Sequence, residues 1–170
     1  MASLIDELID VLDKEEREYQ DLILLSQEKT PVIVRGDLEK LQKITEAEQV
    51  VIGKINKLEK KRTEVAKDIA LVLNKDEETL KVLDIADLLQ GQKEEQKKLL
   101  AVYDRLRDTL KKMTTVNEMN KGLVNESLDF INYNLNLMKS VYQEPGTGNY
   151  TKNAFNTTPV AGVGVFDAKQ

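Results

Sequence analysis

The chain has 170 residues, of which 32% are charged and 5% are aromatic, and it contains no Trp, His or Cys. This balance is typical of long solvated helices with aliphatic seams. It excludes disulfides and removes the side chains that most often serve as general bases, thiol nucleophiles and zinc ligands. The net charge of −5 opposes a nucleic-acid partner, because binding to a phosphate backbone depends on a clustered basic face.

The N-terminus and the hydropathy pattern indicate a cytoplasmic protein. Asp6 and Glu7 stand where a signal peptide would carry Lys or Arg, and no later apolar run approaches about 18 residues. The sequence therefore predicts no export signal and no membrane insertion. It also has no Gly-rich phosphate loop and no Glu-x-x-His motif, so we predict a protein without catalytic residues, metal or cofactor.

The first predicted helix covers about residues 3–29. Its apolar and bulky residues are spaced three and four apart, at Ile5, Leu8, Leu12, Tyr19 and Leu22. Ser3 is the expected N-cap, with Asp6 and Glu7 in the first turn. Pro31 cannot donate a backbone hydrogen bond and biases the residue before it away from the helical region, so we expect a helix end or kink there.

The second helix begins after a stop-start signal, Gly36 followed by Asp37 as N-cap. Its seam has a mean step of about 3.5 residues, which favours knobs-into-holes packing. The seam consists of Leu41, Ile44, Ala47, Val51, Ile55, Leu58, Arg62, Val65, Ile69 and Val72. Arg62 is its polar member, and it either extends to solvent at the helix edge or pairs with an acid of the first helix.

A short third helix is predicted after the polar break at 74–78. Asp76, Glu77, Glu78 and Thr79 can cap it, and its apolar residues are Leu80, Val82, Leu83, Ile85, Leu88 and Leu89. We expect this helix to close one end of a helical bundle. Gly91 separates it from the next element.

The last predicted helix, about Gln92 to Tyr142, carries the longest periodic pattern. Its expected seam is Leu99, Tyr103, Leu106, Leu110, Met113, Asn117, Asn120, Val124, Ser127, Ile131, Asn134, Met138 and Val141. At 1.5 Å per residue it would span roughly 75 Å, against roughly 55 Å and 40 Å for the second and first helices. The first two helices therefore cannot cover all of it.

Apolar side chains circle much of the second half of this helix. Besides the seam, one flank carries Leu123, Leu128, Leu135 and Tyr142, and another carries Phe130 and Leu137. Such a helix needs cover on several sides, and its own tail, a second copy or a client helix could each provide it. Asn117 and Asn120 either fix the packing register or lie at the surface after a slight rotation of the helix.

Residues 144–170 differ in character from the rest of the chain. They hold Pro145, Pro159 and several Gly among Asn and Thr, without a helical or strand period. We predict a disordered, flexible tail here, and a bundle domain over 3–143. The predicted fold is all-α: an elongated antiparallel bundle of three long helices with a short capping helix.

The order of these landmarks resembles the FlgN family of flagellar export chaperones, over about residues 4–146. The residues that carry the resemblance are Gly36-Asp37-Leu38, Glu59 with Arg62, the stretch from Asn117 to Val124, and Tyr142 followed by Pro145-Gly146. The long tail after Gly148 and the internal Pro31 depart from the family pattern.

The resemblance implies a cytoplasmic chaperone of the flagellar type III export system. Its expected clients are the hook-filament junction proteins, hook-associated proteins one and three, held by their C-terminal helical segments. The export gate protein is a second expected partner, and the export ATPase complex is a further candidate.

The resemblance places client binding on the last helix, where it coincides with the excess apolar surface, and it assigns Tyr142 to the export gate. The predicted client contacts are Asn117, Asn120, Leu123, Val124, Ser127, Leu128, Phe130, Ile131, Leu135 and Met138. The alternative is a structural coiled coil in which the same stripe forms a homodimer without client binding.

Overall fold

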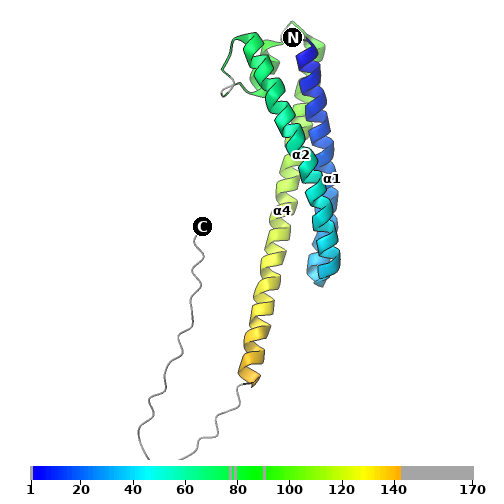
Figure 1. Ribbon diagram of the computed structural model, residues 1–170, viewed down its shortest axis with the longest axis vertical. Helices are drawn as coiled ribbons and strands as arrows, with labels where there is room; N and C mark the ends of the chain where they lie inside the picture. Colours follow the sequence, from blue (N-terminus) through cyan, green and yellow to red (C-terminus); the bar gives the residue numbers. More distant parts are fainter. Residues whose placement is uncertain (1, 77, 79, 90, 143–170) are drawn as a thin grey trace, which may run out of the picture. The chain divides into compact units, whose positions relative to one another are not determined.

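A computed structural model describes residues 2–76, 78, 80–89 and 91–142. The four helices of this part are α1 (Ala2–Arg35), α2 (Leu38–Leu73), α3 (Val82–Leu88) and α4 (Lys93–Tyr142), shown in Figure 1. The described residues contain no strand, which confirms the all-helical prediction. The predicted tail lies outside the described residues. The chain divides into two compact units, 1–133 and 134–170, and the packing described below belongs to the first.

The start and the end of α1 both differ from the prediction. The helix begins at Ala2, so Ser3 lies inside it rather than at its N-cap, and its first turn carries no acid. Pro31 lies within α1, which continues to Arg35, so the predicted helix end was wrong. The burial of Val32 and Ile33, worth roughly 2 kcal/mol each, offsets the cost of about 3 kcal/mol that an internal Pro carries.

The turn between α1 and α2 forms as its sequence predicts. Gly36 has a φ of +68°, in the left-handed region that Gly tolerates best. Its backbone N–H donates to the carbonyl of Ile33 at 3.1 Å. The Asp37 carboxylate accepts a hydrogen bond from the backbone N–H of Lys40 at 3.0 Å and so caps α2. The turn lets α2 pack back along α1 as an antiparallel hairpin (Figure 1).

The buried face of α4 differs from the predicted seam at every second position. Its buried residues are Leu99, Val102, Leu106, Thr109, Met113, Val116 and Asn120. The prediction had placed Tyr103, Leu110 and Asn117 in this row, and these are half-buried or exposed. The predicted and the observed rows have Leu99, Leu106, Met113 and Asn120 in common, and in both rows the spacing alternates between three and four residues. The three residues that distinguish the observed row, Val102, Thr109 and Val116, are all β-branched, and they replace Tyr103, Leu110 and Asn117 on the buried face.

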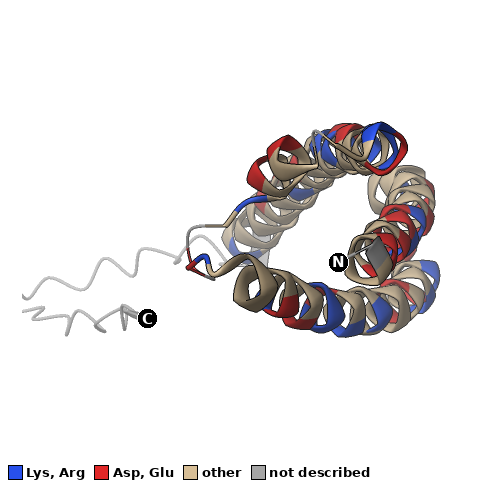
Figure 2. Cartoon of the chain, turned by 90° about the horizontal axis from the view of Figure 1, so that it is seen from above, with Lys and Arg blue, Asp and Glu red and all other residues tan. Residues whose placement is uncertain are grey.

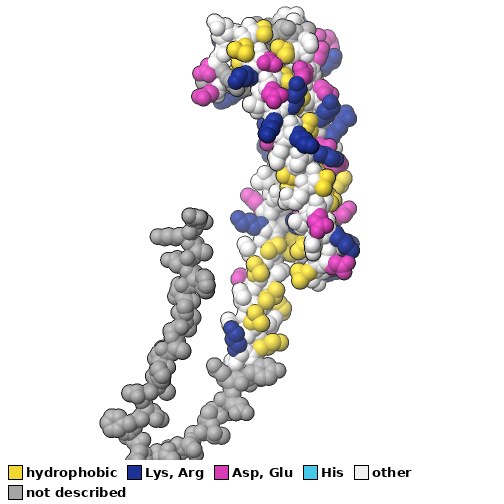
Figure 3. Space-filling model, in the orientation of Figure 1, with side chains coloured by type: hydrophobic (Ala, Val, Ile, Leu, Met, Phe, Trp, Pro, Cys, Tyr) yellow, Lys and Arg dark blue, Asp and Glu magenta, His cyan; other side chains and the backbone are white. Residues whose placement is uncertain are grey.

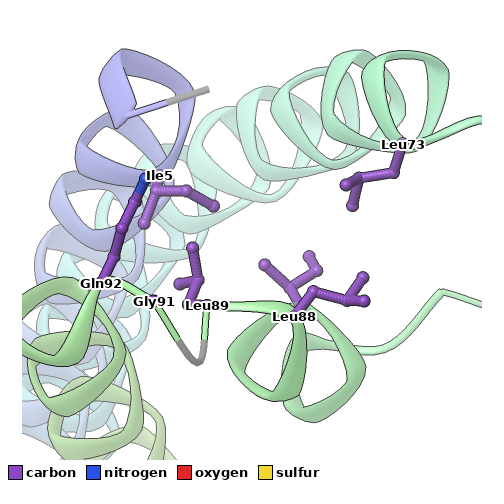
Figure 4. Close-up of a pocket in the computed structure, with 7 residues that line it drawn as sticks. Ile5, Leu73, Leu88, Leu89, Gly91 and Gln92 are labelled. Carbon is purple, nitrogen blue, oxygen red and sulfur yellow. The ribbon is translucent and has the colours of Figure 1, made fainter.

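All four helices contribute to the main core. It is built from Ile5, Leu8, Leu12, Val65, Ile69, Ile85, Ala86, Leu89, Leu99, Val102 and Leu106. Helix α3 supplies Ile85 and Ala86 to this core, as expected of a helix at the end of the bundle. It begins at Val82 with Lys81 as its N-cap, so the predicted cap at 76–79 was wrong. A small cavity of about 140 Å³ remains at this end, where Ile5, Leu73 and Leu88 converge from three helices (Figure 4).

Ion pairs connect the acidic α1 to its neighbours. Lys61 and Lys54 of α2 pair with Glu7 at 2.6 Å and Glu18 at 3.5 Å, and Arg105 of α4 pairs with Asp13 at 2.6 Å. Acidic residues are prominent along the helix that starts at the N label in Figure 2. Exposed pairs contribute only about 0 to 1 kcal/mol each to the free energy of unfolding. Their main effect is to favour this placement of the helices over other placements.

Arg62 pairs with an acid of the first helix, which decides between its two predicted placements. Its Nη1 lies 2.9 Å from Oε2 of Glu15, whose side chain is fully buried. Burial raises the pKa of Glu15, Arg62 opposes this shift, and the nearby Glu59 adds to it. Tyr19 donates a hydrogen bond to Glu59 at 3.3 Å. Glu59 and Arg62, two of the residues on which the family resemblance rests, thus belong to a polar cluster between α1 and α2.

Candidate protein-binding groove

An apolar groove lies where the end of the α1–α2 hairpin meets α4. It has a volume of about 590 Å³. Its lining is Ile33, Val34, Arg35, Gly36, Leu38, Leu41, Leu123, Val124, Glu126, Ser127, Leu128, Phe130 and Ile131. Arg35 and Glu126 are the charged members of this lining. We call this site the hairpin-end groove. In Figure 3, hydrophobic side chains gather beside the end of the hairpin and along α4.

The hairpin turn explains why this surface is open. Val34 and Leu38 flank the turn with 67% and 76% of their surface exposed, while their neighbour Ile33 is buried. The α1–α2 hairpin ends at Gly36, so α4 loses this cover after Asn120. Phe130 of α4 is 68% exposed as a result. Exposed apolar patches of this kind mark interaction sites in soluble proteins.

The groove gathers six of the ten predicted client contacts. These are Leu123, Val124, Ser127, Leu128, Phe130 and Ile131. Asn117 is exposed and does not line the groove. Leu135 and Met138 are also exposed but belong to the second unit and are not part of the lining. The side chain of Tyr142 lies outside the described residues.

Asn120 is committed to the packing between α4 and α1. It is 6% exposed, its amide nitrogen donates to the carbonyl of Ser26 at 2.8 Å, and its side-chain oxygen accepts from the Thr30 hydroxyl at 2.7 Å. The Ser26 hydroxyl donates in turn to Glu48 of α2 at 2.7 Å. Asn120 therefore fixes the register of α4 at the point where the core ends.

Replacing Asn120 with Ala is expected to lower the free energy of unfolding by about 2 kcal/mol. The change removes two hydrogen bonds, one to the Ser26 carbonyl and one from the Thr30 hydroxyl, and each such bond contributes roughly 0.5–1.5 kcal/mol. Urea denaturation followed by circular dichroism measures the difference. The exposed Asn117→Ala is the matched control and is expected to change stability by less than about 0.5 kcal/mol. Equal losses in the two variants would contradict the register role.

The sequence analysis missed the half of the groove that the hairpin supplies. Val34 and Leu38 fall outside the helix seams, on either side of the Gly36 turn. Their signal is two large apolar residues next to a turn, where polar residues are expected. Because the first helix was predicted to cover about residues 3–29, with an end or a kink at Pro31, the run from Val32 to Val34 was not assigned to it.

The chemistry of the groove suits the recognition of apolar side chains. Within the described ranges, no group of three or more acidic residues could hold a metal ion. No helix among the described residues is long and apolar enough to cross a membrane. A groove between helices, apolar and with few charges, is the form that binds an amphipathic helix of another polypeptide. The fold and the groove define the class as an all-helical protein with an exposed apolar groove.

Comparison with known proteins gives the family. The model described as "FlgN protein" matches residues 1–158, so the chain belongs to the FlgN family of flagellar export chaperones. This is a family of chaperones rather than enzymes. The chain is also 28% identical over 152 residues to "Uncharacterized protein YvyG" of Bacillus subtilis (strain 168), covering 89% of both chains. No solved structure matches.

Proposed function

We propose that this protein is a cytoplasmic chaperone of flagellar type III export that binds hook-associated proteins one and three. It keeps them from assembling early and delivers them to the export gate. The hairpin-end groove is the observation that carries this proposal. Family membership supplies the class of function, and the groove supplies a surface that can hold a client segment.

The groove has the apolar lining that a helix-binding site requires. Two walls of different origin, α4 and the hairpin end, allow a client helix to insert apolar side chains at i, i+3, i+4 and i+7. The C-terminal helical segments of the junction proteins are the proposed occupants.

Beyond the groove, the proposal extends along the rest of α4. Leu135 and Met138, which belong to the second unit, are proposed as additional client contacts, and Tyr142 is the proposed contact for the export gate. Such an arrangement would let a client and the gate engage different parts of the same helix. The export ATPase complex remains a further candidate partner.

Replacing Leu38 with Asp tests whether the hairpin wall of the groove contacts the client. Leu38 lines the groove and is largely exposed, so the change should leave the fold intact. We expect the affinity for the C-terminal segments of the junction proteins to fall at least tenfold, because a buried contact is lost and a carboxylate is desolvated. Isothermal titration calorimetry measures both affinities.

The matched control is Val50→Asp, which changes another largely exposed apolar residue of α2 that lies outside the groove. It is expected to bind client segments as the unchanged chain does. Loss of affinity in both variants would show a general effect of added charge and would argue against the groove. A stable dimer that ignores client segments would instead favour the alternative function, a self-associating coiled coil.

A further inference from the structure

A second apolar depression lies between α2 and α4, nearer to α3. It consists of two adjoining grooves of about 370 and 410 Å³ that share Arg62, Val82 and Tyr103. Their apolar walls include Leu110 of α4 and Leu83 of α3, both more than one-third exposed. We call this site the basic groove. It has no lining residue in common with the hairpin-end groove.

The charged residues that line this groove are all basic, although Arg62 is already paired with Glu15 of α1 at 2.9 Å. Its described lining contains Arg62, Lys81, Arg107 and Lys111, and neither Asp nor Glu. This is unusual for a chain with a net charge of −5. Arg107 has acidic neighbours on its own helix, at 3.5 and 3.9 Å, but these contacts are long and more than half exposed. These exposed carboxylates offset part of the charge of Arg107, and the charged side chains that line the groove are still basic.

We propose that the basic groove binds an amphipathic helix with an acidic flank from a second protein partner. The apolar face of that helix would pack on Val82, Tyr103 and Leu110, between α2 and α4. Its carboxylates would then face Arg107 and Lys111, where complementary charge guides orientation and speeds association. The partner thus differs from the proposed client in both its charge and its site.

Two occupants from the chain itself fit this groove less well. Residues 143–170 contain two acidic and two basic residues, so they offer the basic rim no net negative charge. The acidic helix of a second copy would be α1, but its apolar residues Ile5, Leu8 and Leu12 already lie in the core of its own molecule. A separate acidic helix satisfies both the apolar walls and the charge.

The test uses a fluorescent 18-residue peptide designed as an amphipathic helix, with Leu on one face and Glu on both flanks. A second peptide carries Lys in place of every Glu. We expect the full chain to bind the Glu peptide, with an affinity that falls as salt rises, and to bind the Lys peptide at least tenfold more weakly. Fluorescence anisotropy measures both.

The variant with Arg107→Glu and Lys111→Glu should bind the Glu peptide about tenfold more weakly, while still binding the hook-associated segments as before. The control, with Lys97→Glu and Lys121→Glu, makes the same change in net charge at exposed positions of α4 outside the groove. It should keep its affinity. Preserved client binding shows that the variant is folded and separates this proposal from the proposed function.

Four outcomes would overturn the proposal. The two peptides could bind equally well, or the control could lose as much affinity as the variant. A dimer that the variant dissociates, seen by sedimentation, would make a second copy the occupant. Finally, a chain that ends at Tyr142 could bind the Glu peptide much more tightly than the full chain does. That result would identify the chain's own C-terminal segment as the occupant.

Discussion

A variant with Leu128→Asp and Ile131→Asp is expected to lose at least 100-fold in affinity for the C-terminal segments of the hook-associated proteins. Both residues line the hairpin-end groove and are about half exposed, at 52% and 51%. Each lost aliphatic contact costs about 1.5–3 kcal/mol when a client would bury it, and a desolvated carboxylate adds to that cost. Calorimetric titration measures the loss.

The control for this variant is Leu71→Asp, which changes an exposed Leu of α2 that lines none of the groove. It should bind client segments normally. Circular dichroism should show unchanged helicity and a similar unfolding midpoint for both variants, since no residue of the main core is altered. If the double variant unfolds, the two residues belong to the core and the groove assignment fails.

Arg62→Ala is expected to lower the free energy of unfolding by about 2 kcal/mol. The change leaves the fully buried carboxylate of Glu15 without its cationic partner, and its other oxygen already has no hydrogen bond. Breaking a buried pair commonly costs about 3–5 kcal/mol, and the partial exposure of Arg62 reduces this figure. Urea denaturation at neutral pH measures the change.

The pH dependence of this variant follows from the raised pKa of Glu15. Burial raises that pKa and Arg62 opposes the rise, so removing Arg62 raises the pKa further. A carboxyl whose pKa is higher in the folded state holds more protons folded than unfolded. Stability therefore falls as pH rises towards the folded-state pKa and recovers as pH falls. The loss in Arg62→Ala is expected to be smaller at about pH 5 than at about pH 8.

Adding Glu15→Gln to Arg62→Ala separates the charge effect from lost packing. The neutral amide removes the buried charge, so the double variant should be more stable than Arg62→Ala at about pH 8 and should lose the extra pH dependence. A double variant that is no more stable, with the same pH profile, would show that Arg62 contributes through the packing of its side-chain stem.

Helical periodicity and turn chemistry were enough to predict most of the elements. The Gly36-Asp37 turn, most of the seam of α2 and the packing of α3 on the core follow from local signals that tertiary packing reinforces. In the predicted α2 seam, however, Val72 is exposed, and Glu48, which lies outside that seam, is buried. The end of α1 did not follow, because the rule for Pro31 describes an isolated helix. It takes no account of the burial that Val32 and Ile33 gain when α1 continues.

The register of α4 could not be chosen from its own sequence. A row through Tyr103 and Leu110 and a row through Val102 and Thr109 fit the same spacing, and only the partner distinguishes them. In the structure, the Thr109 hydroxyl donates to Glu16 of α1 at 3.0 Å, and Asn120 bonds to the backbone of the same helix. These contacts join residues more than 90 positions apart, which no local pattern reveals.

The α4 side of the hairpin-end groove was predictable because its apolar residues exceed what one seam can bury. The hairpin side was not predictable, since Val34 and Leu38 form part of a groove only when the turn lies against α4. Locating that meeting point requires both the true length of α1 and the register fixed by Asn120. Each of these depends on packing that the sequence pattern leaves open.

The most direct test of the account is a calorimetric titration of the unmodified full chain with the C-terminal helical segments of hook-associated proteins one and three. The account predicts saturable binding with a negative heat-capacity change, because apolar surface is buried in the groove. A well-folded protein that binds neither segment would contradict the proposed chaperone function.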